Sequence, residues 1–180
     1  CGTAPEYTAG ERALLAGREP QERSVRDWFC VAGPQQITSL RTGHVGVIGE
    51  RINPTGKKKM KEALRSGNHD YVMGEAISQT EAGAQILDVN AGLPEIDERA
   101  TMVELVAELQ GVTTLPLQID SADPAVIEAA VRAYPGKALI NSTNGKQEIL
   151  DAVLPIAKHY GCAIVGLTLD EAGIPPTAEG

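Results

Sequence analysis

Two polar residues, Asp120 and Asn141, directly follow the apolar runs LPLQI and ALI. A carboxylate beside a carboxamide suits a flat heterocycle with adjacent donors and acceptors, such as a pterin, because N–H and NH₂ groups pair with carboxylate oxygens. Alternatively, Asp120 caps the next helix and Asn141 closes a turn. Polar residues also follow three other apolar runs, which favours a shared site over five separate turns. These are Glu50 and Asn53, Asp88 and Asn90, and Asp170.

The segment ILDVNAG contains Asp88 and Asn90, which the period-two alternation of a strand places on one face. Val89 then faces the opposite side, towards the helices. Because buried polar groups must be paired, Asp88 and Asn90 either form a structural network beneath a ligand or contact the ligand directly.

The segment GERINPTGKKK contains Glu50, Arg51 and Asn53 directly after the apolar run VGVI. These residues are either a solvated turn with an internal ion pair or the rim of a site. The run from Lys57 to Lys59 is expected to begin a solvated helix, and it could also attract a carboxylate tail of a ligand.

Five apolar runs must position these side chains: VGVIG, QILDVN, TLPLQIDS, KALINST and CAIVGLTLD. They are mostly continuous rather than alternating, which is typical of parallel strands covered on both faces. Helices are predicted between them. Asp97 is the expected N-cap of a helix that stops at Gly111, and Asp123 precedes Pro124 at the start of another. A third helix ends at Gly161, with a kink or a lost hydrogen bond expected at Pro155.

This alternation predicts a parallel α/β sheet, either doubly wound or a barrel. The absence of a Gly-rich phosphate loop after any strand counts against a dinucleotide fold. Polar residues at all five strand ends favour a TIM (β/α)₈ barrel, in which the carboxyl ends of the strands meet at one face. Because such a barrel takes roughly 250 residues, residues 45–180 are expected to be its first five β/α units. Residues 1–20 are predicted to be the tail of a preceding domain, and residues 21–44 a linker with a small hairpin across Gly33 and Pro34.

The composition narrows the possible partners. Hydrophobic residues make up 42% of the 180-residue chain, enough for a real core, and the net charge of -8 argues against a nucleic-acid partner. No apolar stretch approaches the roughly 20 residues that span a bilayer. The three cysteines, Cys1, Cys30 and Cys162, fit a reducing, cytoplasmic location better than a disulfide framework.

Five motifs in series, GERINPTGKKK, EAGAQILDVNAG, LPLQIDS, ALINSTN and IVGLTLDEAGIP, resemble the pterin-binding methyltransferases that use 5-methyltetrahydrofolate. Within that family the resemblance is to the folate module of cobalamin-dependent methionine synthases. It implies methyl transfer to a corrinoid and on to homocysteine, giving methionine. Family residues on later strands are not in this sequence, so the chain alone is expected to be inactive. The resemblance implies pterin hydrogen bonds from Asp120 and Asn141, with Asp88 and Asn90 beneath the pterin and Glu50 and Asn53 at the rim.

The first residues, CGTAPEYT, resemble the end of the GGCCGTTPEHI motif of homocysteine S-methyltransferase barrels. This resemblance implies that residues 1–20 end a homocysteine-binding domain and that Cys1 binds zinc together with cysteines outside this sequence. Two other functions stay open. One is a methyltransferase whose acceptor is a corrinoid iron–sulfur protein; the other is a non-enzymatic folate-binding protein, or a lipoprotein with lipid on Cys1.

Overall fold

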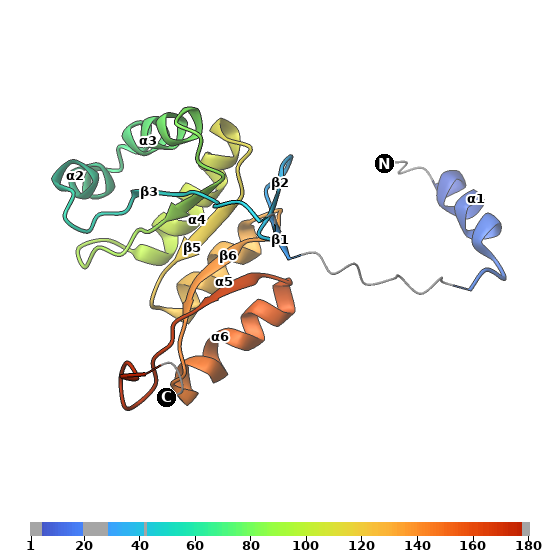
Figure 1. Cartoon of the computed structure of the whole chain (residues 1–180). Helices are drawn as coiled ribbons and strands as arrows, with labels where there is room; N and C mark the ends of the chain where they lie inside the picture. The colour runs from blue at the N-terminus through green and yellow to red at the C-terminus, as the bar shows by residue number, and fades with distance from the viewer. Residues whose placement is uncertain (1–4, 20–28, 42, 178–180) are drawn as a thin grey trace.

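The computed structural model describes residues 5–19, 29–41 and 43–177 (Figure 1). Its main feature is a parallel sheet whose five strands follow one another in chain order. A doubly wound sheet reverses its strand order at a switch point, whereas a barrel adds each strand beside the last. The predicted α/β fold with the first five units of a barrel is therefore confirmed. The strands are β3 (Ile48–Ile52), β4 (Ile86–Val89), β5 (Leu117–Asp120), β6 (Leu139–Thr143) and β7 (Ala163–Gly166).

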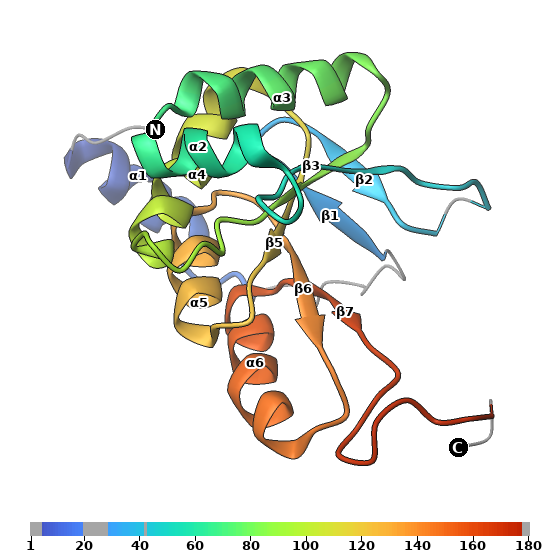
Figure 2. The ribbon, with the colours of Figure 1, turned by 90° about the vertical axis from the view of Figure 1, so that its left-hand side faces the viewer.

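Helices follow the strands and pack against one face of the sheet, and Figure 2 shows α4, α5 and α6 along that side. Between sheet and helices lies the main core, which includes Leu87, Val89 and Ile119 from the strands and Leu105 and Ile127 from the helices. None of the described helices is long and apolar enough to cross a bilayer. The helices are α2 (Lys58–Ser66), α3 (His69–Glu81), α4 (Glu98–Val112), α5 (Pro124–Ala133) and α6 (Gln147–Tyr160).

The ends of the helices follow from local sequence. The Asp97 side chain accepts a hydrogen bond from Ala100 N at 3.0 Å, and Asp123 accepts one from Ala125 N at 2.8 Å, so both predicted N-caps are confirmed. Helix α6 passes through Pro155 and ends at Gly161, whose φ of 69° is left-handed. The expected stop of α4 at Gly111 was wrong: the helix runs to Val112 and ends where Thr113 becomes extended.

The two outer strands differ from the sequence prediction. Strand β3 begins only at Ile48, and Val45 and Val47 are 93% and 53% exposed. Glu50 and Arg51 therefore lie within the strand instead of after it. Strand β7 stops at Gly166, where its pairing with Thr143 ends. Asp170 consequently lies in an exposed turn, where its side chain accepts a hydrogen bond from Ala172 N at 2.8 Å.

Near the N-terminus, α1 (Pro5–Leu15) precedes an antiparallel hairpin of β1 (Cys30–Ala32) and β2 (Ile37–Ser39), which confirms the predicted hairpin. The hairpin packs under the amino ends of the strands. Ala32 bridges to Lys137, and the Tyr134 hydroxyl donates to Ala32 O at 3.1 Å. Fully buried Val31 clusters with Ile86, Leu139 and Ala163 on the sheet face that points away from the helices. We call this the inner face.

Candidate functional site

The inner face changes from apolar to polar along the strands. Its amino-terminal layer contains Ile86, Leu139 and Ala163. Period-two alternation along each strand then places five polar residues on the same face, nearer the carboxyl ends, where barrels carry their sites. They are Asp88 and Asn90 on and after β4, Gln118 and Asp120 on β5, and Asn141 on β6. The alternation does not extend to Thr143, because the register of β6 against β7 shifts between Asn141 and Thr143.

The outer of these layers is built around Asp120. Asn90 Nδ2 donates to Asp120 Oδ2 at 2.9 Å, and Asn90 Oδ1 accepts from Gly92 N at 2.8 Å, so both ends of this amide are engaged. Asn141 is the register partner of Asp120 on the neighbouring strand. Asp120 does not cap α5, because Asp123 does. The turn after β6 is closed by Asn144, whose side chain accepts from Lys146 N at 2.9 Å, rather than by Asn141.

The layer beneath is a second cross-strand pair, in which Gln118 Nε2 donates to Asp88 Oδ1. Asp88 is 1% exposed and Gln118 is 6% exposed. Burial, together with the nearby Asp120 and Glu50 charges, raises the pKa of Asp88 to about 6, although the hydrogen bond from Gln118 and the nearby amide of Asn141 oppose the rise. Within the described residues, three buried side-chain atoms lack a hydrogen-bond partner: Asp88 Oδ2, Gln118 Oε1 and Thr143 Oγ1.

Gln118 was missed by sequence reasoning. The signal for it was the alternation that identified Asp88 and Asn90, because Gln118 lies two residues before Asp120. It was overlooked because it lies inside the apolar run LPLQI instead of after it.

The rim residues pair differently from the expected internal ion pair. Lys57 Nζ lies 3.2 Å from Glu50 Oε2, whereas Arg51 lies 3.9 Å from Glu75 on α3. Neighbouring residues of a strand point to opposite faces, so Glu50 and Arg51 have different partners. Asn53 is buried, and its side-chain oxygen accepts from Thr55 N at 2.8 Å, which closes the turn after β3.

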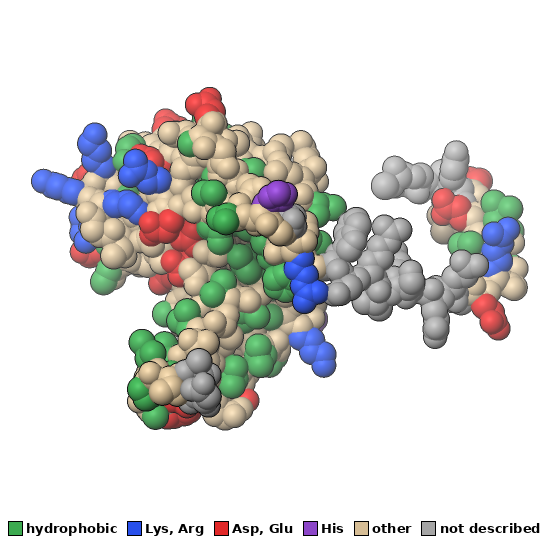
Figure 3. All heavy atoms as spheres, viewed as in Figure 1, with side chains coloured by type: hydrophobic (Ala, Val, Ile, Leu, Met, Phe, Trp, Pro, Cys, Tyr) green, Lys and Arg blue, Asp and Glu red, His purple; other side chains and the backbone are tan. Residues whose placement is uncertain are grey.

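Basic residues gather beside the rim. Figure 3 shows Lys and Arg side chains around α2. Lys58 and Lys59 are exposed at the start of this helix, as predicted. A shallow pocket there is lined by Arg51, Lys57, Lys58, Lys59, Tyr71 and Glu75.

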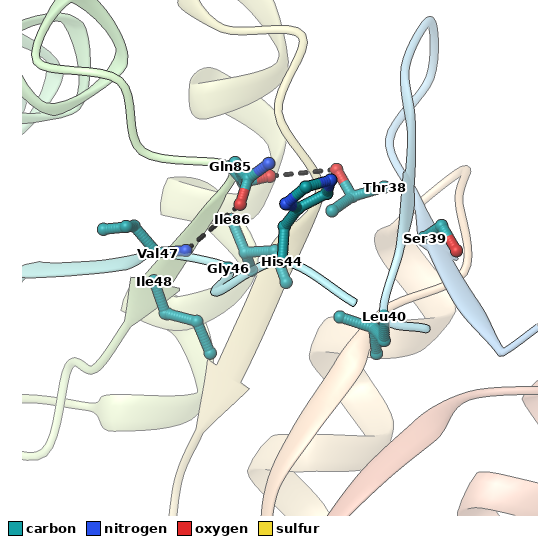
Figure 4. A pocket seen from close by; sticks show the side chains of 9 residues that line it. All are labelled: Thr38, Ser39, Leu40, His44, Gly46, Val47, Ile48, Gln85 and Ile86. Atoms are coloured by element: carbon teal, nitrogen blue, oxygen red, sulfur yellow. Dashed lines mark hydrogen bonds between the residues drawn. The ribbon is translucent and has the colours of Figure 1, made fainter. Parts of the chain in front are cut away.

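A further pocket of about 180 Å³ lies at the opposite end of the strands, between the hairpin and the starts of β3 and β4 (Figure 4). Gln85 hydrogen-bonds to both sides of this pocket. The Gln85 carbonyl accepts from Thr38 Oγ1, and the Gln85 side-chain oxygen accepts from Val47 N, both at 3.1 Å. Ile48 and Ile86, the first residues of their strands, also line it. Since barrel chemistry is built at the carboxyl ends of the strands, the polar layers are the better candidate site.

The predicted zinc ligand, Cys1, lies outside the described residues. In the part of the chain that the structure describes, no three His, Cys, Asp or Glu side chains come together as a metal site. Cys162 packs against the core just before β7, and burial raises the pKa of its thiol. His69 pairs with Glu108 at 2.9 Å on the helical side.

Comparison with known proteins agrees with this geometry. Residues 49–179 match the family model described as pterin binding enzyme. A methionine synthase of Mycobacterium tuberculosis is 31% identical over 185 aligned residues, which cover 99% of this chain but only 16% of that protein. The 7,8-dihydropteroate synthase of Vibrio fischeri ES114 has the same fold, with a TM-score of 0.54 at 19% identity over 77% of this chain and 48% of its own. The chain belongs to the pterin-binding enzyme family.

Proposed function

We propose that this chain is the pterin-binding part of a methyltransferase that takes its methyl group from 5-methyltetrahydrofolate. The observation that carries the proposal is the Asp120 carboxylate, which Asn90 holds at 2.9 Å beside Asn141 at the carboxyl ends of neighbouring strands. Asn90 occupies Oδ2, and the other oxygen of Asp120 can accept an N–H or NH₂ of the pterin edge.

In this proposal each residue has a distinct task. Asp120 and Asn141 bind the donor and acceptor groups of the pterin ring, and Asn90 fixes the orientation of Asp120. Asp88 lies beneath them, while Glu50 and Asn53 form the rim. Holding the ring in one orientation lowers the entropic cost of the reaction. A tertiary amine is a poor leaving group, so N5 must gain a hydrogen bond or a proton as its C–N bond breaks.

We also propose the methyl acceptors, on the basis of the similarity to a methionine synthase. A corrinoid, cobalamin, would supply the nucleophilic metal that accepts the methyl group, and homocysteine would be the final acceptor. Residues 1–20 would end a homocysteine-binding domain with Cys1 as one zinc ligand, residues 21–44 would be the linker, and residues 45–180 would begin the pterin-binding domain. The task of the described residues is to bind and orient the pterin.

The test is calorimetric titration of the full-length protein with 5-methyltetrahydrofolate, comparing the wild type with Asp120→Asn. The amide keeps one acceptor but turns an NH₂ group towards the ligand's donors. Losing a charge-assisted hydrogen bond costs about 1.5–3 kcal/mol, or roughly 10- to 150-fold in Kd.

Asp123→Asn is the matched control for this titration. It makes the same change three residues later, at a helix cap where Asn serves as well as Asp. Equal affinity of the wild type and Asp120→Asn would remove Asp120 from the site. A full-length wild-type protein that binds no reduced pterin would refute the proposed function.

A further inference from the structure

The two polar layers of the inner face have reversed chemistry. In the outer layer the amide belongs to β4 and its following loop, as Asn90, and the carboxylate belongs to β5, as Asp120. In the inner layer the carboxylate belongs to β4, as Asp88, and the amide to β5, as Gln118. Asp88 and Gln118 are also register partners in the sheet. Both layers are thus cross-strand pairs of one carboxyl group and one carboxamide.

The pairs differ in how completely their hydrogen bonds are made. Asp88 and Gln118 share one hydrogen bond, from Nε2 to Oδ1. The remaining oxygens of the same two planar groups, Asp88 Oδ2 and Gln118 Oε1, are buried and have no partner in the described part of the chain. Two acceptors cannot satisfy each other, and an unsatisfied buried acceptor costs free energy. A single proton on Asp88 removes both deficits, because a protonated carboxyl group gains one donor.

We infer that Asp88 and Gln118 form a proton-holding acid–amide pair in which Asp88 Oδ2–H donates to Gln118 Oε1 while Gln118 Nε2 donates to Asp88 Oδ1. The inference rests on the proposed function in one respect: the pair is the floor of the pterin site. Gln118 is then a positioning residue, which acts through Asp88 on the layer above.

The groups around Asp88 favour the proton. Asp120 on β5 and Glu50 on β3 are both acidic, and their charges raise the pKa of Asp88. The side chain that faces it from β6 is the neutral amide of Asn141. Burial contributes most to the raised pKa, about 6. Below about pH 6, where Asp88 is neutral, Asp120 is the remaining carboxylate of these two layers, so the negative charge lies where the pterin donors are proposed to bind.

The decisive experiment exchanges the two groups between the strands. Asp88→Asn, Gln118→Glu and the double variant keep the size of each side chain. The readout is chemical unfolding of the ligand-free protein as a function of pH. Folded Asp88 binds its proton more tightly than the unfolded chain does, so wild-type stability should fall as the pH rises from 3.8 to about 6. Asp88→Asn should lack this decline, because its amide makes both hydrogen bonds without titrating.

The double variant then shows whether Asp88 and Gln118 act as a coupled pair or as two independent residues. Gln118→Glu places two carboxyl groups side by side and should lower the unfolding midpoint above pH 6. The double variant restores one acid and one amide and should recover most of that loss. If the double variant is only as stable as the sum of the single effects, the pair does not exist. If Asp88→Asn keeps the wild-type decline, Asp88 is not the titrating group.

Pterin affinity links the pair to the site. Below pH 6, Asp88→Asn should bind 5-methyltetrahydrofolate within about threefold of the wild type, because the amide replaces a neutral acid, whereas Asp120→Asn should lose at least about tenfold. Equal loss in both variants would show that the ligand needs charge at Asp88, which would overturn the inference while supporting the proposed function. The unfolding experiment needs no ligand, so it tests the pair even if the proposed function fails.

Discussion

The Tyr134 hydroxyl hydrogen-bonds to both the hairpin and the parallel sheet, and Tyr134→Phe tests what this contact contributes to stability. Its hydroxyl donates to Ala32 O and accepts from Leu117 N, both at 3.1 Å, and the residue is 5% exposed. Without the hydroxyl, Ala32 O keeps a hydrogen bond from Lys137 N at 2.9 Å. Leu117 N is left buried without its acceptor. One unsatisfied buried donor costs about 1–3 kcal/mol, and in a chain of this size each kcal/mol lowers Tm by roughly 2–4 °C.

The assay is urea unfolding and thermal melting of the full chain, with Tyr160→Phe as the matched control. Among the described residues the Tyr160 hydroxyl has no hydrogen-bond partner, so this variant should stay within about 0.5 kcal/mol of the wild type. Burial also raises the pKa of Tyr134 from 10.0 to about 12, so the folded state keeps a proton that the unfolded chain loses. Wild-type stability should therefore decline between pH 10.0 and about 12, and this component should vanish in Tyr134→Phe. Equal stability of both variants at neutral pH would refute the reasoning.

Two further predictions concern the candidate site and the contact between the hairpin and the sheet. In the full-length protein, Asn141→Ala should slow methyl transfer from 5-methyltetrahydrofolate to added cob(I)alamin by about tenfold or more, but leave homocysteine methylation from added methylcobalamin unchanged, because only the first half-reaction uses the pterin. Asn144→Ala, which alters only the turn, is its control, and equal loss in both half-reactions would make Asn141 structural. Gly136→Ala should cost at least about 1–3 kcal/mol in urea unfolding, because the new Cβ overlaps Ala32 O and comes within 2.8 Å of the Tyr134 ring. Gly74→Ala is the control: it lies at an open position of α3, so the added methyl group should stabilise the protein by up to about 1 kcal/mol. If Gly74→Ala destabilises the protein while Gly136→Ala is tolerated, the close packing of Gly136 against Ala32 and Tyr134 is contradicted.

Local signals in the sequence were sufficient for the order of the elements and for several helix ends. Asp97 and Asp123 cap their helices because a cap needs only the backbone of the next few residues. Continuous apolar runs indicated parallel strands, because their side chains are covered on both faces. Alternation likewise places Asp88 and Asn90 on one face of β4, where each bonds a different residue of β5.

Tertiary structure decided the limits of the outer strands. VGVIG has the composition of a strand, but β3 begins at Ile48, where pairing with Ile86 begins. Strand β7 ends where its pairing with Thr143 ends, so Asp170 is a turn residue rather than part of the polar layers. A strand extends only as far as its neighbour supplies hydrogen bonds, and the neighbour is distant in sequence.

The sequence by itself determined which residue types are available to the site and which face of their own strand they occupy. Tertiary structure alone decided their partners. Asn90 meets Asp120 and Asp88 meets Gln118 because β4 and β5 pair in one particular register, with the partners 30 positions apart in the sequence in each case. Shifting that register by one residue would turn the polar side chains of one strand towards the helices. The same register buries Gln118 against Asp88, which is why an unremarked glutamine inside an apolar run becomes a central residue of the candidate site.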